Sequence, residues 1–469
     1  MKGKFDFAGL FVLDLANNHQ GSVAHGLKVI QESAAVVAEN QVRAGIKFQF
    51  RDLDTFIHPA HTEQTDNKHI PRFLSTRLSR DEYRQLLQEV RRHSLVAICT
   101  PFDERSVDLI VAMDIDVIKI ASCSAADWPL IEKIAEAGKP VIFSTGGLTL
   151  KQIDDLVSYF DHRRVDFAFM HCVAVYPTPT GQLELGQISL LRKRYPNCMI
   201  GFSTHEAPDD TVPVQLAAAK GAQMFERHIG VETDEITLNA YSSTPAQLDA
   251  WFKSFHKAMA ACGVDGSRYE PTGVEFDSLG SLRRGVYAKR PIKPQETLER
   301  EDVYFAMPLE EGQLESGSWR DGIVVADGVE RDGAVMGENA EIPRDYETQE
   351  IYTAIHDIKA MLNEASIAVP SEFKMEISHH YGMKDFRQVG AVLIDCVNRS
   401  YCKKIIVVLP GQRHPSHYHK VKEETFQCLS GILELEVDGR RKTLYPGDTL
   451  LVQPGVWHEF WSSDGSVLE

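Results

Sequence analysis

The chain has 469 residues, of which 43% are hydrophobic and 25% are charged, and its formal net charge is −17. This length predicts about two to four domains, and the composition is that of a globular protein with a sizeable core. The excess of acidic residues argues against a protein that binds nucleic acid or an anionic membrane. No apolar run reaches the roughly 18 residues of a membrane span, and no signal peptide is recognisable, so we expect a cytoplasmic protein.

Short β-rich segments alternate with helical patterns over the first half of the chain. Val23, Leu27 and Ile30, for example, recur at the spacing of one helix face. The strand candidates read GLFVLDLA, AGIKFQF, LVAICTPF, DVIKIAS, PVIFSTGG, DFAFMHCVAVYP, MIGFSTHE and AQMFERHIG. Such strand–helix units predict an α/β fold, a (β/α)8 TIM barrel, over residues 1–265. A doubly wound open sheet is the alternative, but no G-x-G-x-x-G segment opens a helix.

Each strand candidate begins with apolar residues and ends with polar ones. In a TIM barrel the carboxyl ends of the strands converge at one mouth, where ligands bind. The last candidate ends with three consecutive ionisable residues, Glu226, Arg227 and His228. Burying such groups unpaired costs several kcal/mol each. We therefore expect all three at the rim of the barrel rather than in its core.

Two further domains are expected after a linker over residues 263–279. Residues 280–343 contain short strand patterns between Gly and Pro turns, which predict a small β-rich domain. Residues 370–469 are strand-rich and predict a jelly roll. The last motif lies close to the end of the sequence, so a closing strand of this jelly roll could be missing.

The barrel region resembles the sialic acid (nonulosonate) synthase family, including its spore-coat polysaccharide synthase branch. The resemblance rests on ANNHQGS, IKFQ, CTPFD, IKIASC, STGG, MHCVAVYPTP, IGFSTHE and FERHIG, which occur in the family's order. The later segment RRGVYAKRPIKPQETLEREDV is similar to the family's small antifreeze-like (SAF) domain.

The resemblance implies a metal-dependent transferase that condenses phosphoenolpyruvate (PEP) with an aldose, for example an N-acylated or otherwise modified sugar. Such an enzyme forms a C–C bond, releases phosphate and yields a nonulosonic or ulosonic acid for bacterial surface polysaccharide. It also implies a homodimer in which the SAF domain of one subunit covers the partner's barrel. Two alternatives stay open: a metal-dependent aldolase or lyase on the same barrel, and a non-catalytic sugar-phosphate-binding protein.

The residue types at the matched positions suit this chemistry. Ammonium and hydroxyl groups can hold the carboxylate and phosphate of PEP through charge-assisted hydrogen bonds. The expected PEP-binding residues are Lys47, Thr100, Lys119, Ser122, Ser144 and Ser203. The expected catalytic residues are Asp14, Lys47, Lys119, Tyr176 and Glu226, with Asp14, Tyr176 and Glu226 lining the acceptor side.

His205 and His228 match the family's two metal-binding histidines. Neutral imidazoles suit Mn²⁺, with Mg²⁺ or Co²⁺ as alternatives. The ion would act as a Lewis acid on the aldehyde of the acceptor.

Several positions depart from the family pattern. Asp14 replaces a glutamate, Ser124 replaces an acidic residue and Ala174 replaces an asparagine. Met307 occupies the position of an arginine that, in the family, reaches the partner's barrel and contacts the N-acetyl group of N-acetylmannosamine. These differences indicate another acceptor sugar, and they leave open which residue handles the proton.

The C-terminal region resembles a cupin. GQRHPSHYHKVKEETFQCLSG fits the first cupin motif with His417, His419 and Glu424, and GDTLLVQPGVWHEF fits the second with His458. Three imidazoles and a carboxylate suit Zn²⁺, Fe²⁺ or Mn²⁺. His417 and His419 are two positions apart, so on a strand both would face the interior. A non-catalytic role in sugar binding or assembly is the alternative.

Overall fold

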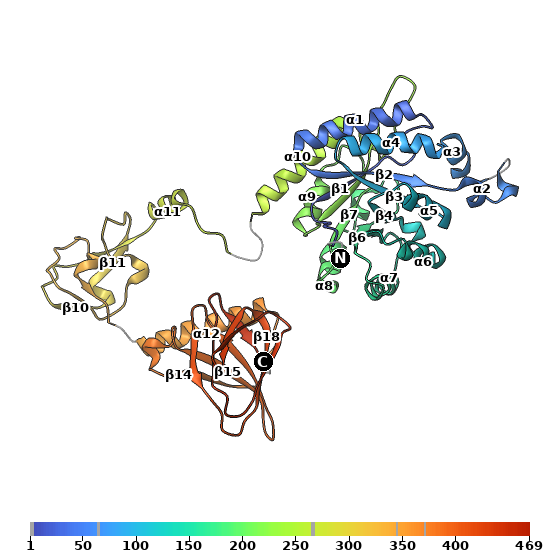
Figure 1. Ribbon diagram of the computed structural model, residues 1–469. Helices are drawn as coiled ribbons and strands as arrows, with labels where there is room; N and C mark the ends of the chain where they lie inside the picture. Colours follow the sequence, from blue (N-terminus) through green and yellow to red (C-terminus); the bar gives the residue numbers. More distant parts are fainter. Residues whose placement is uncertain (1–3, 63–65, 264–267, 344–345, 370–371) are drawn as a thin grey trace. The chain divides into compact units, whose positions relative to one another are not determined.

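The computed structural model describes residues 4–62, 66–263, 268–343, 346–369 and 372–469. The chain forms two compact units, Met1–Glu270 and Pro271–Glu469 (Figure 1). The domain boundaries that the sequence predicts within the second unit stay predictions. None of the helices in the described part of the chain is long and apolar enough to cross a membrane.

The first unit is a closed parallel barrel, which confirms the predicted TIM fold. Neighbouring strands pair in sequence order, and pairing of the first strand with the eighth closes the barrel, with Asp14 opposite His228. The strands are β1 Leu10–Asp14, β2 Arg43–Phe50, β3 Val96–Pro101, β4 Val117–Ile120, β5 Val141–Ser144, β6 Phe167–Cys172, β7 Ile200–Ser203 and β8 Met224–His228.

Helices surround this barrel in the described residues (Figure 1). They are α1 Val23–Asn40, α2 Leu53–Phe56, α3 His69–Ser75, α4 Arg80–Arg92, α5 Glu104–Ala112, α6 Trp128–Glu136, α7 Leu150–His162, α8 Gly186–Arg194, α9 Val212–Ala219 and α10 Pro245–Cys262. Capping boxes begin α4, α7 and α10, where Ser79, Thr149 and Thr244 each bond reciprocally with the residue three positions later. Local sequence therefore fixes where these helices begin.

Strand alternation divides the barrel residues between two environments. Inside the barrel, Leu10, Val12, Ile98, Ile142 and Met224 form an apolar plug away from the mouth. The alternate residues face the helices and form the larger core around Phe11, Phe225 and Trp251. The polar residues of the inward face are thus confined to the carboxyl ends of the strands.

Arg227 does not lie at the rim, so that part of the prediction is wrong. Its neighbour Glu226 points into the barrel, and Arg227 therefore points to the helix layer, where its guanidinium carbon is 5.3 Å from the ring centroid of Trp251. Arg227 Nη2 lies 3.5 Å from Oε1 of Glu206, and both side chains are almost fully buried. The arginine is consequently half of a buried ion pair between β8 and the segment that follows β7.

Three buried apolar clusters lie among the described residues of the second unit. A helix, α11 Gly273–Gly280, overlaps the second half of the expected linker and ends one residue beyond it. The strands that follow are β9 Gly285–Ala288, β10 Glu296–Leu298, β11 Val303–Ala306, β12 Ile323–Val325 and β13 Ala340–Glu341. They form two small antiparallel sheets, β10–β12–β13 and β9–β11.

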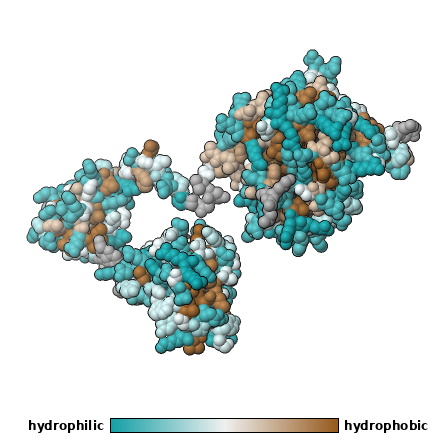
Figure 2. Space-filling view, in the orientation of Figure 1, coloured by the Kyte–Doolittle hydropathy of each residue, from teal (hydrophilic) through white to brown (hydrophobic). Residues whose placement is uncertain are grey.

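The remainder of this unit is the predicted jelly roll, preceded by α12 Tyr346–Glu364. Its strands are β14 Lys374–His379, β15 Gly390–Asn398, β16 Cys402–Val408, β17 Arg413–His417, β18 Glu424–Gly431, β19 Leu433–Val437, β20 Arg440–Leu444, β21 Thr449–Val452, β22 His458–Trp461 and β23 Ser466–Leu468. A six-stranded and a four-stranded sheet enclose a core that includes Phe426 and Phe460. β23 lies between β16 and β18 in the six-stranded sheet. Hydrophilic residues cover most of the face seen in Figure 2.

The buried ion pair of Arg227 with Glu206 leads to a prediction about the stability of the barrel. Arg227→Met should destabilise the barrel, because Glu206 would lose its counter-charge inside the protein. Burial already raises the pKa of Glu206 to about 7 although Arg227 opposes the shift, and the variant should raise this pKa further. In the folded variant Glu206 then keeps a proton that it releases at its ordinary pKa in the unfolded chain. The variant's loss in free energy of unfolding should therefore grow with rising pH, to roughly 3–5 kcal/mol.

Calorimetric unfolding of the full chain between about pH 6 and about pH 9 measures this effect. Arg194→Met is the matched control, because Arg194 pairs with Asp154 on the surface, where water screens the interaction. Equal and pH-independent losses in the two variants would contradict the assignment of a buried pair.

Candidate active site and candidate metal centre

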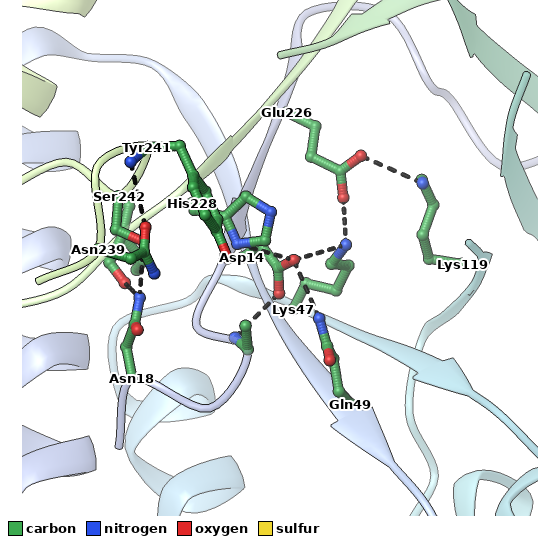
Figure 3. Close-up of polar contacts among 12 residues, drawn as sticks. Asp14, Asn18, Lys47, Gln49, Lys119, Glu226, His228, Asn239, Tyr241 and Ser242 are labelled. Carbon is green, nitrogen blue, oxygen red and sulfur yellow. Dashed lines mark hydrogen bonds and ion pairs between the residues drawn. The ribbon is translucent and has the colours of Figure 1, made fainter. Parts of the chain in front are cut away.

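A network of acidic and basic side chains, alternating in charge, lies buried at the carboxyl ends of the barrel strands (Figure 3). Nζ of Lys47 is 3.0 Å from Oδ2 of Asp14 and donates a hydrogen bond to Oε1 of Glu226. The other oxygen of Glu226, Oε2, is 3.1 Å from Nζ of Lys119. Lys119 donates to Oγ of Ser144 at 2.6 Å. Side chains from five different strands thereby meet in one network.

The network controls the protonation of its members. Burial alone would raise the pKa of Glu226, but the charges of Lys119 and Lys47 hold it well below its usual value. Burial would lower the pKa of Lys47, and Asp14 and Glu226 outweigh that effect and raise it. For Lys119 burial wins, and its pKa is lowered although Glu226 opposes the change. Glu226 is therefore an anion and Lys47 a cation at neutral pH, whereas Lys119 holds its proton less firmly.

The hydroxyl residues predicted for PEP lie around the same mouth. Ser203 is the register partner of Glu226 on the neighbouring strand and hydrogen-bonds to its carboxylate. Ser122 Oγ accepts a hydrogen bond from the backbone N–H of Gly146 at 3.0 Å. Thr100 is 1% exposed, and its Oγ1 has no hydrogen-bond partner among the described residues. Hydroxyl side chains and lysines thus lie around the same mouth, and both kinds of group can donate hydrogen bonds to an anion.

His205 and His228 lie next to this network, with ring centroids 5.4 Å apart. Nδ1 of His205 is 3.1 Å from the carbonyl oxygen of Val173, so this nitrogen is the donor and Nε2 keeps its lone pair. Nδ1 of His228 is 3.3 Å from Oδ2 of Asp14. Burial lowers the pKa of both imidazoles, to about 3 for His205, so both are neutral at neutral pH.

Two neutral imidazoles at this separation fit one divalent cation with nitrogen–metal distances of about 2.1 Å. The only set of three or more His, Cys, Asp or Glu residues with converging ligand atoms in the described part of the chain lies elsewhere, in the jelly roll. A cation in the barrel would therefore keep open positions for water or substrate.

Two tyrosines stand beside these histidines. The ring of Tyr176 is 4.1 Å from that of His205, and the residue is 51% exposed. Tyr241 follows β8 and lies 5.0 Å from the ring of His228 and 5.2 Å from that of Tyr176. No pattern in the sequence identifies Tyr241, because its segment is neither a predicted strand nor part of a motif. Asn18 holds that segment by donating to the Ile229 carbonyl at 2.7 Å and to Ser242 Oγ at 3.0 Å (Figure 3).

Gln49 is a second residue that the sequence analysis missed. Its Nε2 donates to Oδ2 of Asp14 at 3.2 Å (Figure 3). Gln49 is two positions after Lys47 on β2, and strand alternation places both side chains on the inward face. The same two-residue period could have identified it.

The jelly roll brings its four predicted ligands together. The ligand atoms of His417, His419, Glu424 and His458 all lie within 4.8 Å of one another. His417 and His458 are register partners on β17 and β22, and their Nδ1 atoms lie 3.0 and 3.1 Å from the carbonyl oxygens of Pro415 and Val456. Each Nδ1 is thus the donor, and each Nε2 is the nitrogen that can bind a metal; in His458 it faces Oε2 of Glu424.

Glu424, the first residue of β18, completes this tetrad. Its Oε2 is 3.1 Å from Nε2 of His458 and its Oε1 is 3.2 Å from Nε2 of His419. His419 lies beyond the end of β17, so the expectation that it shares a strand with His417 is wrong, although the two imidazoles still converge. Lys422 also donates to Oε1 of Glu424 and would have to leave that oxygen when a cation binds.

The barrel with its polar mouth and the jelly roll with its His/Glu tetrad define a TIM-barrel protein fused to a cupin. The NeuB family model matches residues 35–266, and the cupin domain model matches residues 404–468. The chain belongs to the NeuB family.

Relatives support this assignment over much of the chain. A crystal structure of a Chromobacterium violaceum protein, described as a "putative spore coat polysaccharide biosynthesis protein E", is 43% identical in sequence with a TM-score of 0.67, and the match covers 71% of this chain and all of that one. N-acetylneuraminate-9-phosphate synthase of Drosophila melanogaster is 30% identical over 50% of this chain and 63% of its own length. N,N'-diacetyllegionaminic acid synthase of Campylobacter jejuni is 24% identical over 64% of this chain and 90% of its own.

The tetrad predicts metal binding that is independent of the barrel. The full chain should bind about two divalent ions, and His458→Ala should remove one of them, because three ligands with an imidazole missing no longer close the site. Isothermal titration with Mn²⁺ and with Zn²⁺ gives the stoichiometry. His162→Ala, which removes an exposed histidine on α7, is the control and should keep both ions. An unchanged stoichiometry in His458→Ala would exclude this metal centre.

Proposed function

We propose that the protein is a condensing synthase that joins PEP to an aldose, releases phosphate and yields a nonulosonic or ulosonic acid. One observation carries this proposal: buried lysines and hydroxyls, suited to a small dianion, lie directly beside two neutral imidazoles suited to a cation. The names of the relatives, among them N-acetylneuraminate-9-phosphate synthase and N,N'-diacetyllegionaminic acid synthase, agree with it. We assign the protein a role in the cytoplasm, where it makes a precursor of a surface polysaccharide.

We assign the first group of residues to the binding of PEP. Lys119 and Ser144 hold the phosphate of PEP, with Thr100, Ser122 and Ser203 as further hydroxyl donors. These contacts and burial keep bulk water from the enol phosphate. Carbon C3 of PEP then forms the new bond to the aldehyde carbon as the C2–C3 double bond opens. One water adds its oxygen to C2, one of its protons goes to the former aldehyde oxygen and the other leaves with the phosphate. The C2–O bond to phosphate breaks and a ketone remains at C2.

The acceptor lies on the side of Asp14, Tyr176 and Glu226. Lys47 links both carboxylates and fixes their positions before the substrate arrives. A divalent cation at His205 and His228, Mn²⁺ or alternatively Mg²⁺ or Co²⁺, would supply a Lewis acid for the aldehyde oxygen.

The remaining assignments concern the second unit. We propose that residues 280–343 are an SAF domain and that the protein is a homodimer with this domain over the partner's barrel. The position of the family's arginine is taken by Met307, whose side chain is 54% exposed and carries no charge. The acceptor is therefore a sugar other than N-acetylmannosamine. The cupin recognises or prepares a sugar, with Zn²⁺, Fe²⁺ or Mn²⁺ in its tetrad.

Phosphate release tests the reaction. With PEP, Mn²⁺ and a panel of aldoses, the protein should release inorganic phosphate only when an acceptor is present. Release with no need for PEP would indicate an aldolase, and PEP binding without any release would indicate a non-catalytic protein. If N-acetylmannosamine were the best acceptor, the inference about the acceptor would be wrong.

Variants of the imidazole pair test the cation site in the barrel. His205→Ala and His228→Ala should each lower kcat by about a hundredfold or more, because the aldehyde would lose an electrophile worth several kcal/mol. The dissociation constant for PEP should change little, since the lysines and hydroxyls stay in place. His162→Ala is again the matched control. Wild-type kcat in both active-site variants would contradict the proposal.

A further inference from the structure

Arg51 is a cation at the barrel mouth that neither the PEP site nor the metal site uses. It comes two residues after Gln49 and directly after the end of β2, so Lys47, Gln49 and Arg51 form a column from the buried network to the rim. Its guanidinium lies between two aromatic rings. Cζ is 4.0 Å from the ring centroid of Phe73 on α3 and 3.6 Å from that of Phe102, which follows β3.

This guanidinium has no anionic partner among the described residues. Among the described residues, Nη2 of Arg51 donates a hydrogen bond to Oε1 of Gln49 at 3.1 Å, and Nε of Arg51 is buried without a hydrogen-bond partner. Burial lowers the pKa of Arg51 to about 10, so it is still charged at neutral pH. Lys47 and Lys119, in contrast, are both within ion-pair distance of Glu226. A partly desolvated cation without a counter-charge is costly, and its persistence at a mouth indicates a ligand that supplies the charge.

Arg72 adds a second guanidinium on the same side. It precedes Phe73 in α3, is half-buried, and forms no ion pair with any described residue. Its charge acts on Tyr241, which lies beside the imidazole pair. The Arg51 side of the mouth therefore carries positive charge near the acceptor-side residues.

We propose that Arg51, with Arg72 as an outer partner, binds an anionic substituent of the acceptor sugar, either a phosphate monoester or a carboxylate. The rings of Phe73 and Phe102 both lie close to the Arg51 guanidinium, so its remaining N–H groups, at the edge, are those that can pair with the oxygens of a phosphate or carboxylate. Lys47, which belongs to the buried network, is four positions earlier and lies within β2, whereas Arg51 lies beyond its end. This anion is therefore distinct from PEP. The inference rests on the proposed synthase function and names the class of its acceptor.

The test compares matched acceptors: a neutral aldose, its 6-phosphate and its uronic acid. The wild-type kcat/KM should be at least about tenfold higher for one of the two anionic sugars than for the neutral one. Arg51→Gln should lose about ten- to a hundredfold on that anionic sugar, the range expected for hydrogen bonds to a charged group, and far less on the neutral aldose. Arg51→Lys should keep part of the preference. The preferred sugar distinguishes phosphate from carboxylate.

Arg77→Gln is the matched control, because Arg77 is close in sequence to α3 but is exposed and paired bidentately with Asp54. It should keep the wild-type preference. Three results would overturn the inference: no anionic preference in the wild type, an unchanged preference in Arg51→Gln, or a rise in the KM for PEP that is equal with every acceptor. The last would place Arg51 in the PEP site.

A binding measurement separates this inference from the synthase itself. Isothermal titration of the aldose 6-phosphate and the uronic acid is done with PEP present and metal chelated, so that no turnover is needed. If no aldose supports phosphate release, yet the wild type binds an anionic sugar and Arg51→Gln binds it at least about tenfold more weakly, the anion subsite stands and the synthase function fails. Equal binding by the two proteins overturns the subsite.

Discussion

The barrel mouth depends on one interaction, the contact of Glu226 with both Lys47 and Lys119. Each of these groups, buried alone, would cost several kcal/mol or lose its charge. Together they stay ionised, because each oxygen of the carboxylate faces an ammonium group. The geometry is rigid, since the residues come from three strands of a closed barrel rather than from loops. This pre-formed arrangement lets an incoming anion meet oriented donors instead of water.

The same alternation that builds the mouth also builds its support. Glu226 faces inward and Arg227 faces the helices, where it pairs with Glu206 beside the ring of Trp251. The last strand therefore carries adjacent charges into two separate buried networks. A one-residue shift in its register would exchange them and leave both networks unpaired. This constraint explains why three ionisable residues can follow one another in a buried strand.

The two candidate metal sites use one local device on unrelated folds. In the barrel, His205 places Nδ1 against a backbone carbonyl, and in the jelly roll His417 and His458 do the same. The backbone thereby selects the tautomer and directs the Nε2 lone pair to the site. The barrel pair leaves positions open, as suits a cation that meets substrate. The cupin tetrad supplies four protein ligands, so the two sites differ in how much of a cation they leave exposed.

The sequence by itself determined the barrel, the jelly roll, the family and most of the mouth, because strand periodicity and ordered motifs are local properties of the chain. Lys47, Lys119, Glu226 and the cupin tetrad were all identified in this way. Only the tertiary structure decided that Arg227 faces the helices, that Tyr241 lies against the histidines and that Arg51 has no counter-charge among the described residues. Those facts depend on what residues distant in sequence place, or fail to place, next to a side chain. Pairing and its absence are properties of three-dimensional neighbours, which a linear pattern does not record.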